Sequence, residues 1–322
     1  MNVPTPEDSP PSEKFSSSAN APVPAPKRAL GKWALRLFSG VLVVALLLMQ
    51  RGTALRLLQT LAHTPLWVYL AGVAFYLLGQ ALCAWKWQLL LRARGFHFSF
   101  ARCCSIYLSG MFANLWLPTN IGGDALRVSQ LASDARITAS DAFASILLDR
   151  LTGFAALIFL AFLGLLGSGA ARGQWPLVAI SLALLCAVTG ALFSLPRVKH
   201  PKVKRVGEAV TAYAHQRAAL SIAFALSLVF QLSQVALNFG LARALGLPVG
   251  PLEMGWIGPV LSLSGLLPIG IGGLGTREVA AVALLGRLGV ARGDAVAWSL
   301  LWQATVWGAS LPGLLFLKRP TK

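Results

Sequence analysis

The sequence predicts an all-α protein that crosses a membrane several times, and three observations support this. Of the 322 residues, 56% are hydrophobic and only 12% are charged, whereas soluble domains carry about 25% charged residues. Several apolar stretches are long enough to cross a hydrocarbon core of about 30 Å. These stretches are continuous rather than alternating, which argues against a β-barrel.

The chain divides into a short tail and one membrane domain. Residues 1–30 are rich in Pro, Ser and Ala, so we expect a disordered tail on the cytoplasmic side. Residues 31–322 form the predicted transmembrane domain. Its first span, about residues 37–49, follows basic residues as a signal peptide would. Because residues 50–52 (Gln-Arg-Gly) do not resemble a cleavage site, we expect an uncleaved helix.

Five further full spans and two hairpins follow. The full spans are expected at about residues 66–91, 143–168, 175–195, 219–246 and 294–317. Two shorter apolar stretches each end at a Leu-Pro pair. We interpret each as the first arm of a re-entrant hairpin. Such a hairpin consists of a short helix that enters the membrane, a tip broken by Pro and Gly, and a short helix that returns to the same side. The hairpins are expected at 101–135 and 253–291.

Basic residues set the expected orientation in the inner membrane of a bacterium. If the N-terminus is cytoplasmic, the basic loops 92–102 and 197–217 and the basic C-terminus all lie inside, as the positive-inside rule requires. This explains the net charge of +17 better than nucleic-acid binding does. Three full spans separate the hairpins, so their tips enter from opposite sides and meet near the midplane, as in many secondary transporters.

The two predicted tips have nearly the same sequence. Leu-Pro-Thr-Asn-Ile-Gly-Gly at residues 117–123 returns as Leu-Pro-Ile-Gly-Ile-Gly-Gly at residues 267–273, with five of seven positions identical. Arg127 and Arg277 follow at the same offset. Broken backbone at membrane depth is tolerated only where protein or a water-filled cavity covers it. The repeat therefore indicates a transport site at the tips.

The tips carry the predicted substrate-binding residues. Glycines let backbone amides turn toward a ligand, helix N-termini favour anions, and the planar fork of arginine suits phosphate. These arguments predict an anion site made of Arg127, Arg277, Asn120, Gly122, Gly123, Gly272 and Gly273. The alternative is that the glycines and prolines only permit close helix packing or a kink.

Four more ionisable residues are expected to balance charge or relay protons: Asp124, Asp149, Arg150 and Glu278. Ionisable groups at membrane depth are costly and suggest function by default. Structural alternatives remain, because Asp124 and Glu278 lie where carboxylates cap helices. Asp124 can also bridge to Arg127, and Arg150 can reach the lipid headgroups. Adjacent helical residues do not face each other, so we expect Asp149 to pair with Arg127 instead.

Polar and aromatic residues inside the spans give a weaker signal. Gln231, Gln234 and Asn238 recur at helical spacing, which favours hydrogen bonds between helices slightly over ligand contact. The tryptophans, such as Trp67 and Trp256, mostly lie near span ends and are interpreted as interface anchors.

No fingerprint of soluble-type catalysis occurs in a fitting context. The sequence has no Gly-x-Ser-x-Gly motif, Walker loop or His-Glu-x-x-His motif, and no cluster with metal-ligand spacing. We expect no enzymatic activity, no cofactor and no metal. Transport would then be passive, ion-coupled or driven by a partner.

The order of the motifs resembles the membrane region of lysylphosphatidylglycerol synthases. This flippase-like superfamily also includes proteins encoded with hopanoid and glycolipid synthesis. The resemblance covers about residues 35–317 and runs through Asn114 to Pro118, Gly122-Gly123-Asp124, Arg127, Asp149-Arg150, Pro268, Gly272 to Glu278, and Gly289-Val290. It implies a helical fold with inward-facing re-entrant segments and lipid translocation. Bifunctional members add a soluble aminoacyltransferase domain, for which this sequence has no room, so lysyl transfer is not expected.

The expected function is therefore a lipid translocase that binds an anionic headgroup, with membrane lipids as partners. One alternative is a non-transporting membrane partner of a lipid, hopanoid or glycan biosynthetic enzyme. Another is an intramembrane transferase with Asp124 as base, against which the absence of a nucleophile and donor site argues.

Overall fold

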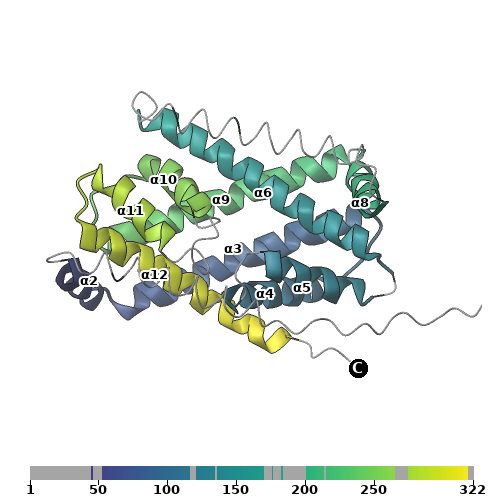
Figure 1. Ribbon diagram of the computed structural model, residues 1–322, viewed down its shortest axis with the longest axis horizontal. Helices are drawn as coiled ribbons and strands as arrows, with labels where there is room; N and C mark the ends of the chain where they lie inside the picture. Colours follow the sequence, from purple (N-terminus) through teal and green to yellow (C-terminus); the bar gives the residue numbers. More distant parts are fainter. Residues whose placement is uncertain are drawn as a thin grey trace, which may run out of the picture.

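The computed structural model describes residues 53–116, 121–134, 136–169, 201–213, 215–264 and 275–317, together with Ala45, Pro176 and Ala183. These residues form helices joined by turns and contain no strand (Figure 1). The helices are α2 (Thr53–Ala62), α3 (Leu66–Ala93), α4 (Phe100–Trp116), α5 (Ile121–Ala132), α6 (Ala139–Gly167), α8 (Pro201–Thr211), α9 (Arg217–Ala244), α10 (Pro251–Ser264), α11 (Thr276–Gly286), α12 (Arg292–Ser310) and the 3-10 helix η3 (Leu311–Phe316). The predicted spans at 37–49 and 175–195, apart from Ala45, Pro176 and Ala183, lie outside the described residues.

Three of the described helices, α3, α6 and α9, are long and apolar enough to cross a membrane. They coincide with the predicted spans at 66–91, 143–168 and 219–246, which confirms an all-α membrane protein. The outer faces of α3 and α6 carry exposed apolar side chains such as Leu70, Leu78 and Leu163. A helix that is apolar on all sides is expected where lipid covers the face that water would otherwise cover.

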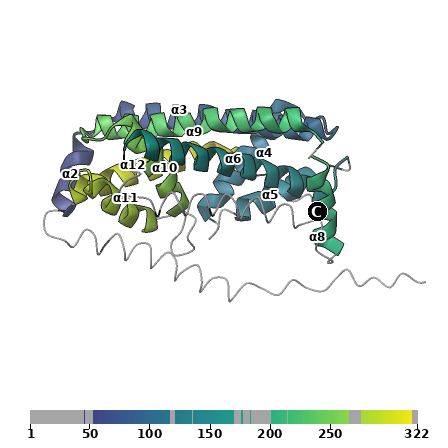
Figure 2. The same ribbon diagram turned by 90° about the horizontal axis from the view of Figure 1, so that it is seen from above.

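The two predicted hairpin regions each contain two described helices, and the residues that join them, 117–120 and 265–274, lie outside the described residues. Helices α4 and α5 occupy the region predicted at 101–135, and α10 and α11 occupy that predicted at 253–291. Figures 1 and 2 show α4 and α5 toward the end of the bundle that holds α8, and α10 and α11 toward the end that holds α2. The two pairs thus lie at opposite ends, as expected of inverted repeats.

Helix contacts repeat between the first half, α3 to α6, and the second half, α9 to α12. Within each half, consecutive helices pack on one another. Between the halves, α12 packs on α3 and α4, and α6 packs in the same way on α9 and α10. The two central helices α3 and α9 also pack together. The contact pattern therefore has a two-fold pseudo-symmetry that matches the sequence repeat.

Close helix crossings depend on small residues. A Cβ at Gly164 of α6 would lie 2.7 Å from the carbonyl carbon of Gly255 in α10, which no real Cβ contact reaches. Small residues let membrane helices approach closely and gain dispersion contacts that lipid cannot supply. This crossing fixes the first half against the second.

Two short helices differ from the prediction. The basic segment 197–217 was predicted as a loop, but it contains α8, which packs on α6. Its basic residues hid the helical spacing of Val206, Ala209 and Val210, which face the core. Helix α2 was not predicted either; it packs on α12, and the Thr60 hydroxyl donates to Asp294 at 2.7 Å.

Candidate functional site

A cavity of about 320 Å³ lies between the two hairpins. All eight helices from α3 to α6 and from α9 to α12 contribute side chains to its wall. The charged residues in that wall are Asp124, Arg127, Arg150 and Arg277. The structure thus brings the two arginines of the repeated motif to one cavity, although they are far apart in sequence.

Arg127 in α5 is only 3% exposed and is held by two carboxylates. One terminal nitrogen donates to Asp149 Oδ2 at 3.2 Å, and the other donates to Asp124 Oδ1 at 3.4 Å. The predicted pairing of Asp149 with Arg127 is therefore confirmed. The guanidinium also lies 4.4 Å from the ring centroid of Trp87 and 4.3 Å from that of Tyr107. Charge and aromatic contacts together fix this side chain.

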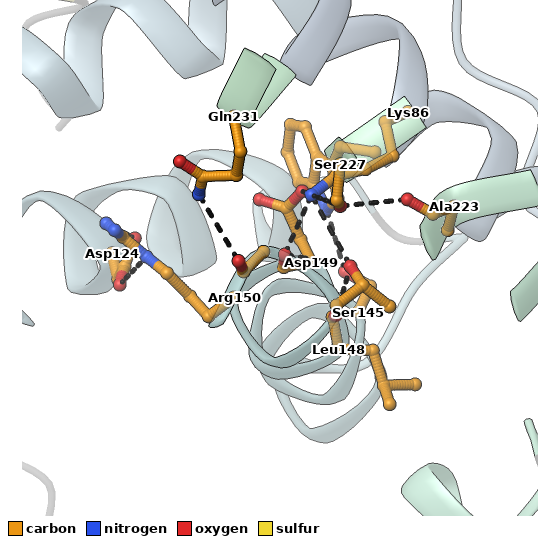
Figure 3. Close-up of polar contacts among 12 residues, drawn as sticks. Lys86, Asp124, Ser145, Leu148, Asp149, Arg150, Ala223, Ser227 and Gln231 are labelled. Carbon is orange, nitrogen blue, oxygen red and sulfur yellow. Dashed lines mark hydrogen bonds and ion pairs between the residues drawn. The ribbon is translucent and has the colours of Figure 1, made fainter. Parts of the chain in front are cut away.

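Asp124 joins α5 to α6 through a second arginine. Arg150 donates from Nε to Asp124 Oδ2 and from Nη2 to Asp124 Oδ1, both at 3.0 Å (Figure 3). Such bidentate hydrogen bonding is the strong form of contact between an arginine and a carboxylate. Asp124 therefore makes both the expected bridge to Arg127 and a bridge that the sequence did not reveal.

Lys86 in α3 completes this network and was missed by the sequence analysis. Its ammonium lies 3.0 Å from Asp149 Oδ1 and donates to the Asp149 carbonyl at 2.9 Å and to Ser227 Oγ at 3.0 Å (Figure 3). The residue is 4% exposed. A signal existed, because Lys86 is the one charged residue in the apolar run 66–91, and such a residue suggests function.

Arg277 in α11 is as deeply buried as Arg127, at 2% exposure, but it has different partners. One terminal nitrogen donates to Asn238 Oδ1 at 3.4 Å. The guanidinium stacks 3.5 Å from the ring centroid of Trp302 and lies 5.4 Å from that of Trp298. Among the described residues, no carboxylate oxygen comes within 4 Å of it.

Glu278, the neighbour of Arg277, is fully buried and directed elsewhere. Its carboxylate accepts hydrogen bonds from the Gly275 backbone N–H and from Ser299 Oγ, the latter at 3.1 Å. The contact with Gly275 is a helix-capping contact, and Gly275 has φ +94°, a conformation that favours glycine. Ser299 follows Arg277 by 22 residues, as Asp149 follows Arg127. A neutral serine thus stands where the first half has an aspartate.

The predicted tip residues fall into two groups. Asn120, Gly272 and Gly273 lie outside the described residues. Gly122 is half-buried at the start of α5. Gly123 is buried, its N–H donates to Asn114 Oδ1 at 2.8 Å, and an added Cβ would collide with the Gly110 carbonyl oxygen. Gly123 therefore permits the close packing of α4 on α5. This agrees with the alternative interpretation, in which the glycines allow close helix packing.

Two of the three polar residues predicted to form a stripe on α9 make hydrogen bonds between helices, as the favoured interpretation expects, whereas Gln234 Nε2 is buried without a partner among the described residues. Gln231 donates to the Gly153 carbonyl of α6 at 3.3 Å, and Asn238 contacts Arg277 and accepts from Trp298 at its carbonyl. The interface-anchor interpretation is wrong for Trp256, which is buried because α10 lies inside the bundle. Trp67 is 69% exposed at the start of α3, as that interpretation expects.

The seven charged side chains of this group do not cancel. Four are cations and three are anions, which leaves one excess positive charge; they are Lys86, Arg127, Arg150, Arg277, Asp124, Asp149 and Glu278. Among the described residues, no group of three or more His, Cys, Asp and Glu is placed to hold a metal ion. The cavity therefore favours an anion by charge.

The arrangement agrees with a family comparison. The family described as the lysylphosphatidylglycerol synthase TM region matches residues 33–313. The chain belongs to this family. Membership makes it a membrane protein connected with lipid metabolism, as the order of the motifs implied. A search of curated proteins found no match.

Proposed function

We propose that this member of the family is a lipid translocase of the bacterial inner membrane. An anionic headgroup occupies the cavity between the hairpins while the lipid tail stays in the bilayer. The N- and C-termini lie in the cytoplasm in this proposal. The chain itself carries out no chemical step.

One observation carries the proposal. Arg127 and Arg277 come from the two repeats, yet both line one cavity whose charged group has an excess of one positive charge. Two inverted elements that share a central site can expose it to each side of the membrane in turn. Buried guanidinium groups attract an anion strongly because little water screens them.

The positions of the carboxylates support transport over intramembrane catalysis. Both oxygens of Asp124 accept hydrogen bonds from Arg150, and one of them also accepts from Arg127. Arginine N–H groups thus occupy three of the roughly four acceptor positions of this carboxylate, whereas a general base needs an oxygen directed at the substrate proton. Asp124 is better suited to hold two arginines in place.

Reconstitution in liposomes tests the proposal. Fluorescent phosphatidylglycerol is placed in both leaflets, and a membrane-impermeant quencher reports how fast the inner pool becomes accessible. We expect Arg127→Ala and Arg277→Ala to lower the rate at least tenfold. Arg136→Gln is the matched control, because Arg136 is exposed in the loop between α5 and α6, where it contacts Asp134 and the Phe98 ring and does not line the cavity.

Two results would contradict the proposal. Wild-type rates in both folded arginine variants would remove the cavity from the transport path. Quenching no faster than in protein-free liposomes, together with stable co-purification of a biosynthetic enzyme, would replace transport with the non-transporting partner role.

A further inference from the structure

The two buried arginines differ in how many of their donors are already used. Both terminal nitrogens of Arg127 donate to carboxylates, at 3.2 and 3.4 Å. Within the described ranges, Arg277 has one long hydrogen bond, 3.4 Å, to the neutral Asn238 amide. The Nε atom of each arginine is buried and has no partner among the described residues. Arg277 therefore keeps most of its charge uncompensated by nearby oxygen.

The stacking of Arg277 leaves its edge available. A guanidinium that lies on an aromatic face keeps its N–H bonds in its own plane, where they can reach oxygen atoms. Arg277 lies on Trp302, and both residues line the cavity. Trp302 Nε1 is also buried, with no partner in the part of the chain that the structure describes. Two donor groups without partners thus belong to adjacent side chains of one wall.

We infer that Arg277, with Trp302 beside it, is the anion contact of the site, and that it takes the single phosphodiester of a lipid headgroup with one negative charge. This inference rests on the proposed function and names its substrate class. Arg127 acts as a positioning residue that ties α5 to α6. The seven charged side chains have one excess positive charge, which the single negative charge of the headgroup would neutralise.

The size of the cavity agrees with one small headgroup. Ligand pockets usually have volumes of about 300–1,000 Å³, and this one, at about 320 Å³, is at the lower end. It has room for a phosphodiester with a small alcohol, and none for an acyl chain as well. The chains must therefore leave the cavity toward the bilayer.

A binding measurement on the intact purified protein in an uncharged detergent tests this without transport. Retention of phosphatidylglycerol is compared with that of phosphatidylcholine, whose ammonium cancels the phosphate charge, and of cardiolipin, which has two phosphodiesters. We expect phosphatidylglycerol to bind at least tenfold more tightly than phosphatidylcholine, and cardiolipin to bind no more tightly than phosphatidylglycerol. The single-charge assignment would be overturned if phosphatidylcholine bound as tightly as phosphatidylglycerol, or if cardiolipin bound tenfold more tightly than phosphatidylglycerol.

Two variants separate the arginines. Arg277→Gln leaves no carboxylate of a described residue without its cation, and we expect at least a tenfold loss of phosphatidylglycerol affinity. Arg127→Lys keeps a charge for Asp124 and Asp149, and we expect affinity within threefold of wild type. Thermal unfolding checks that both fold. If Arg277→Gln does not fold, Arg277→Lys replaces it, with at least a threefold loss expected because the planar fork is gone.

Contrary results are equally clear. Wild-type affinity in the folded Arg277 variant, or a tenfold loss in Arg127→Lys, would overturn the division of roles. Inorganic phosphate is offered alone as a further arm, and binding as tight as that of the lipid would assign the site to a free anion. Lipid binding that depends on Arg277 but occurs without translocation would contradict the proposed function and would still support this inference.

Discussion

The two halves of the molecule place an arginine at the same point of the same hairpin, but they surround it differently. In the first half, Arg127 meets two aspartates. In the second half, Arg277 meets an amide and two indole rings, and the position that corresponds to Asp149 is Ser299. The duplicated fold has therefore kept its geometry while its electrostatics diverged. One half is stabilised by charge, and the other keeps its cation available.

Removal of Asp149 should give the largest difference between the halves. Asp149→Ala leaves Lys86 and Arg127 buried side by side without their shared counter-ion, so we expect a loss of about 3–5 kcal/mol in the free energy of unfolding. Ser299→Ala, at the corresponding position, removes one hydrogen bond to a carboxylate and should cost less, about 1.5–3 kcal/mol. Denaturant unfolding in mild detergent measures both.

A double variant checks the cause of that loss. Lys86→Met combined with Asp149→Leu removes two opposite charges together. The double variant should therefore lose less stability than the single variant Asp149→Leu. Equal losses in Asp149→Ala and Ser299→Ala would show that the halves do not differ as described.

Glycine substitution should give the next largest difference, because Gly123 of α5 lies against the backbone of α4, whereas Gly286 of α11 has open space around it. Gly123→Ala forces a methyl group against the Gly110 carbonyl, and overpacking of this kind costs about 1–3 kcal/mol. Gly286→Ala in α11 meets nothing within 4 Å and should be neutral or slightly stabilising. Thermal unfolding of the two variants compares the hairpins, and similar melting temperatures would contradict the close packing of α4 on α5.

Loss of one aromatic partner from each arginine should have a smaller effect of two different kinds. Tyr107→Leu and Trp302→Leu each remove a cation–π contact worth about 1 kcal/mol. We expect Tyr107→Leu to lower stability chiefly, and Trp302→Leu to lower phosphatidylglycerol affinity chiefly. Unfolding and lipid-retention measurements on both variants test this, and the reverse result would exchange the roles of the halves.

The exposed ion pair of Asp134 and Arg136, outside the cavity, should give the smallest change in stability. Hydrogen bonds from the Arg136 side chain hold the pKa of Asp134 below its usual value. A lowered folded pKa means that the pair stabilises the fold above the unfolded pKa of about 4 and loses this effect as pH falls further. Because the pair is exposed, Arg136→Ala should change the melting temperature at pH 7 by little more than the error, and not at all in strong acid. A large shift at pH 7 would show that the loop is structurally important.

The sequence predicted the parts that depend on local pattern. The apolar runs at α3, α6 and α9 predicted spans, and the paired Leu-Pro and Gly-Gly segments located the hairpins. The Asp149–Arg127 pair was expected because a buried carboxylate needs a cation and its neighbour Arg150 faces away.

The rest required the three-dimensional arrangement. Lys86 was passed over because the apolar residues around it dominate the run, and α8 was hidden by its basic residues. Trp87 and Trp302 looked like the other tryptophans, since nothing local shows which ring lies on an arginine. The unequal partners of the two arginines could not be predicted either, because they come from helices far away in the sequence.

The exchange of helices between the halves has a consequence for biosynthesis. Because α12 rests on α3 and α4, as α6 rests on α9 and α10, each half depends on the other to cover one side of its hairpin. A nascent chain that has inserted only as far as α6 therefore leaves α3 and α4 without their neighbour until the ribosome has delivered α12. The sides of α3 and α4 that face α12 must spend that interval against lipid, water or the translocon.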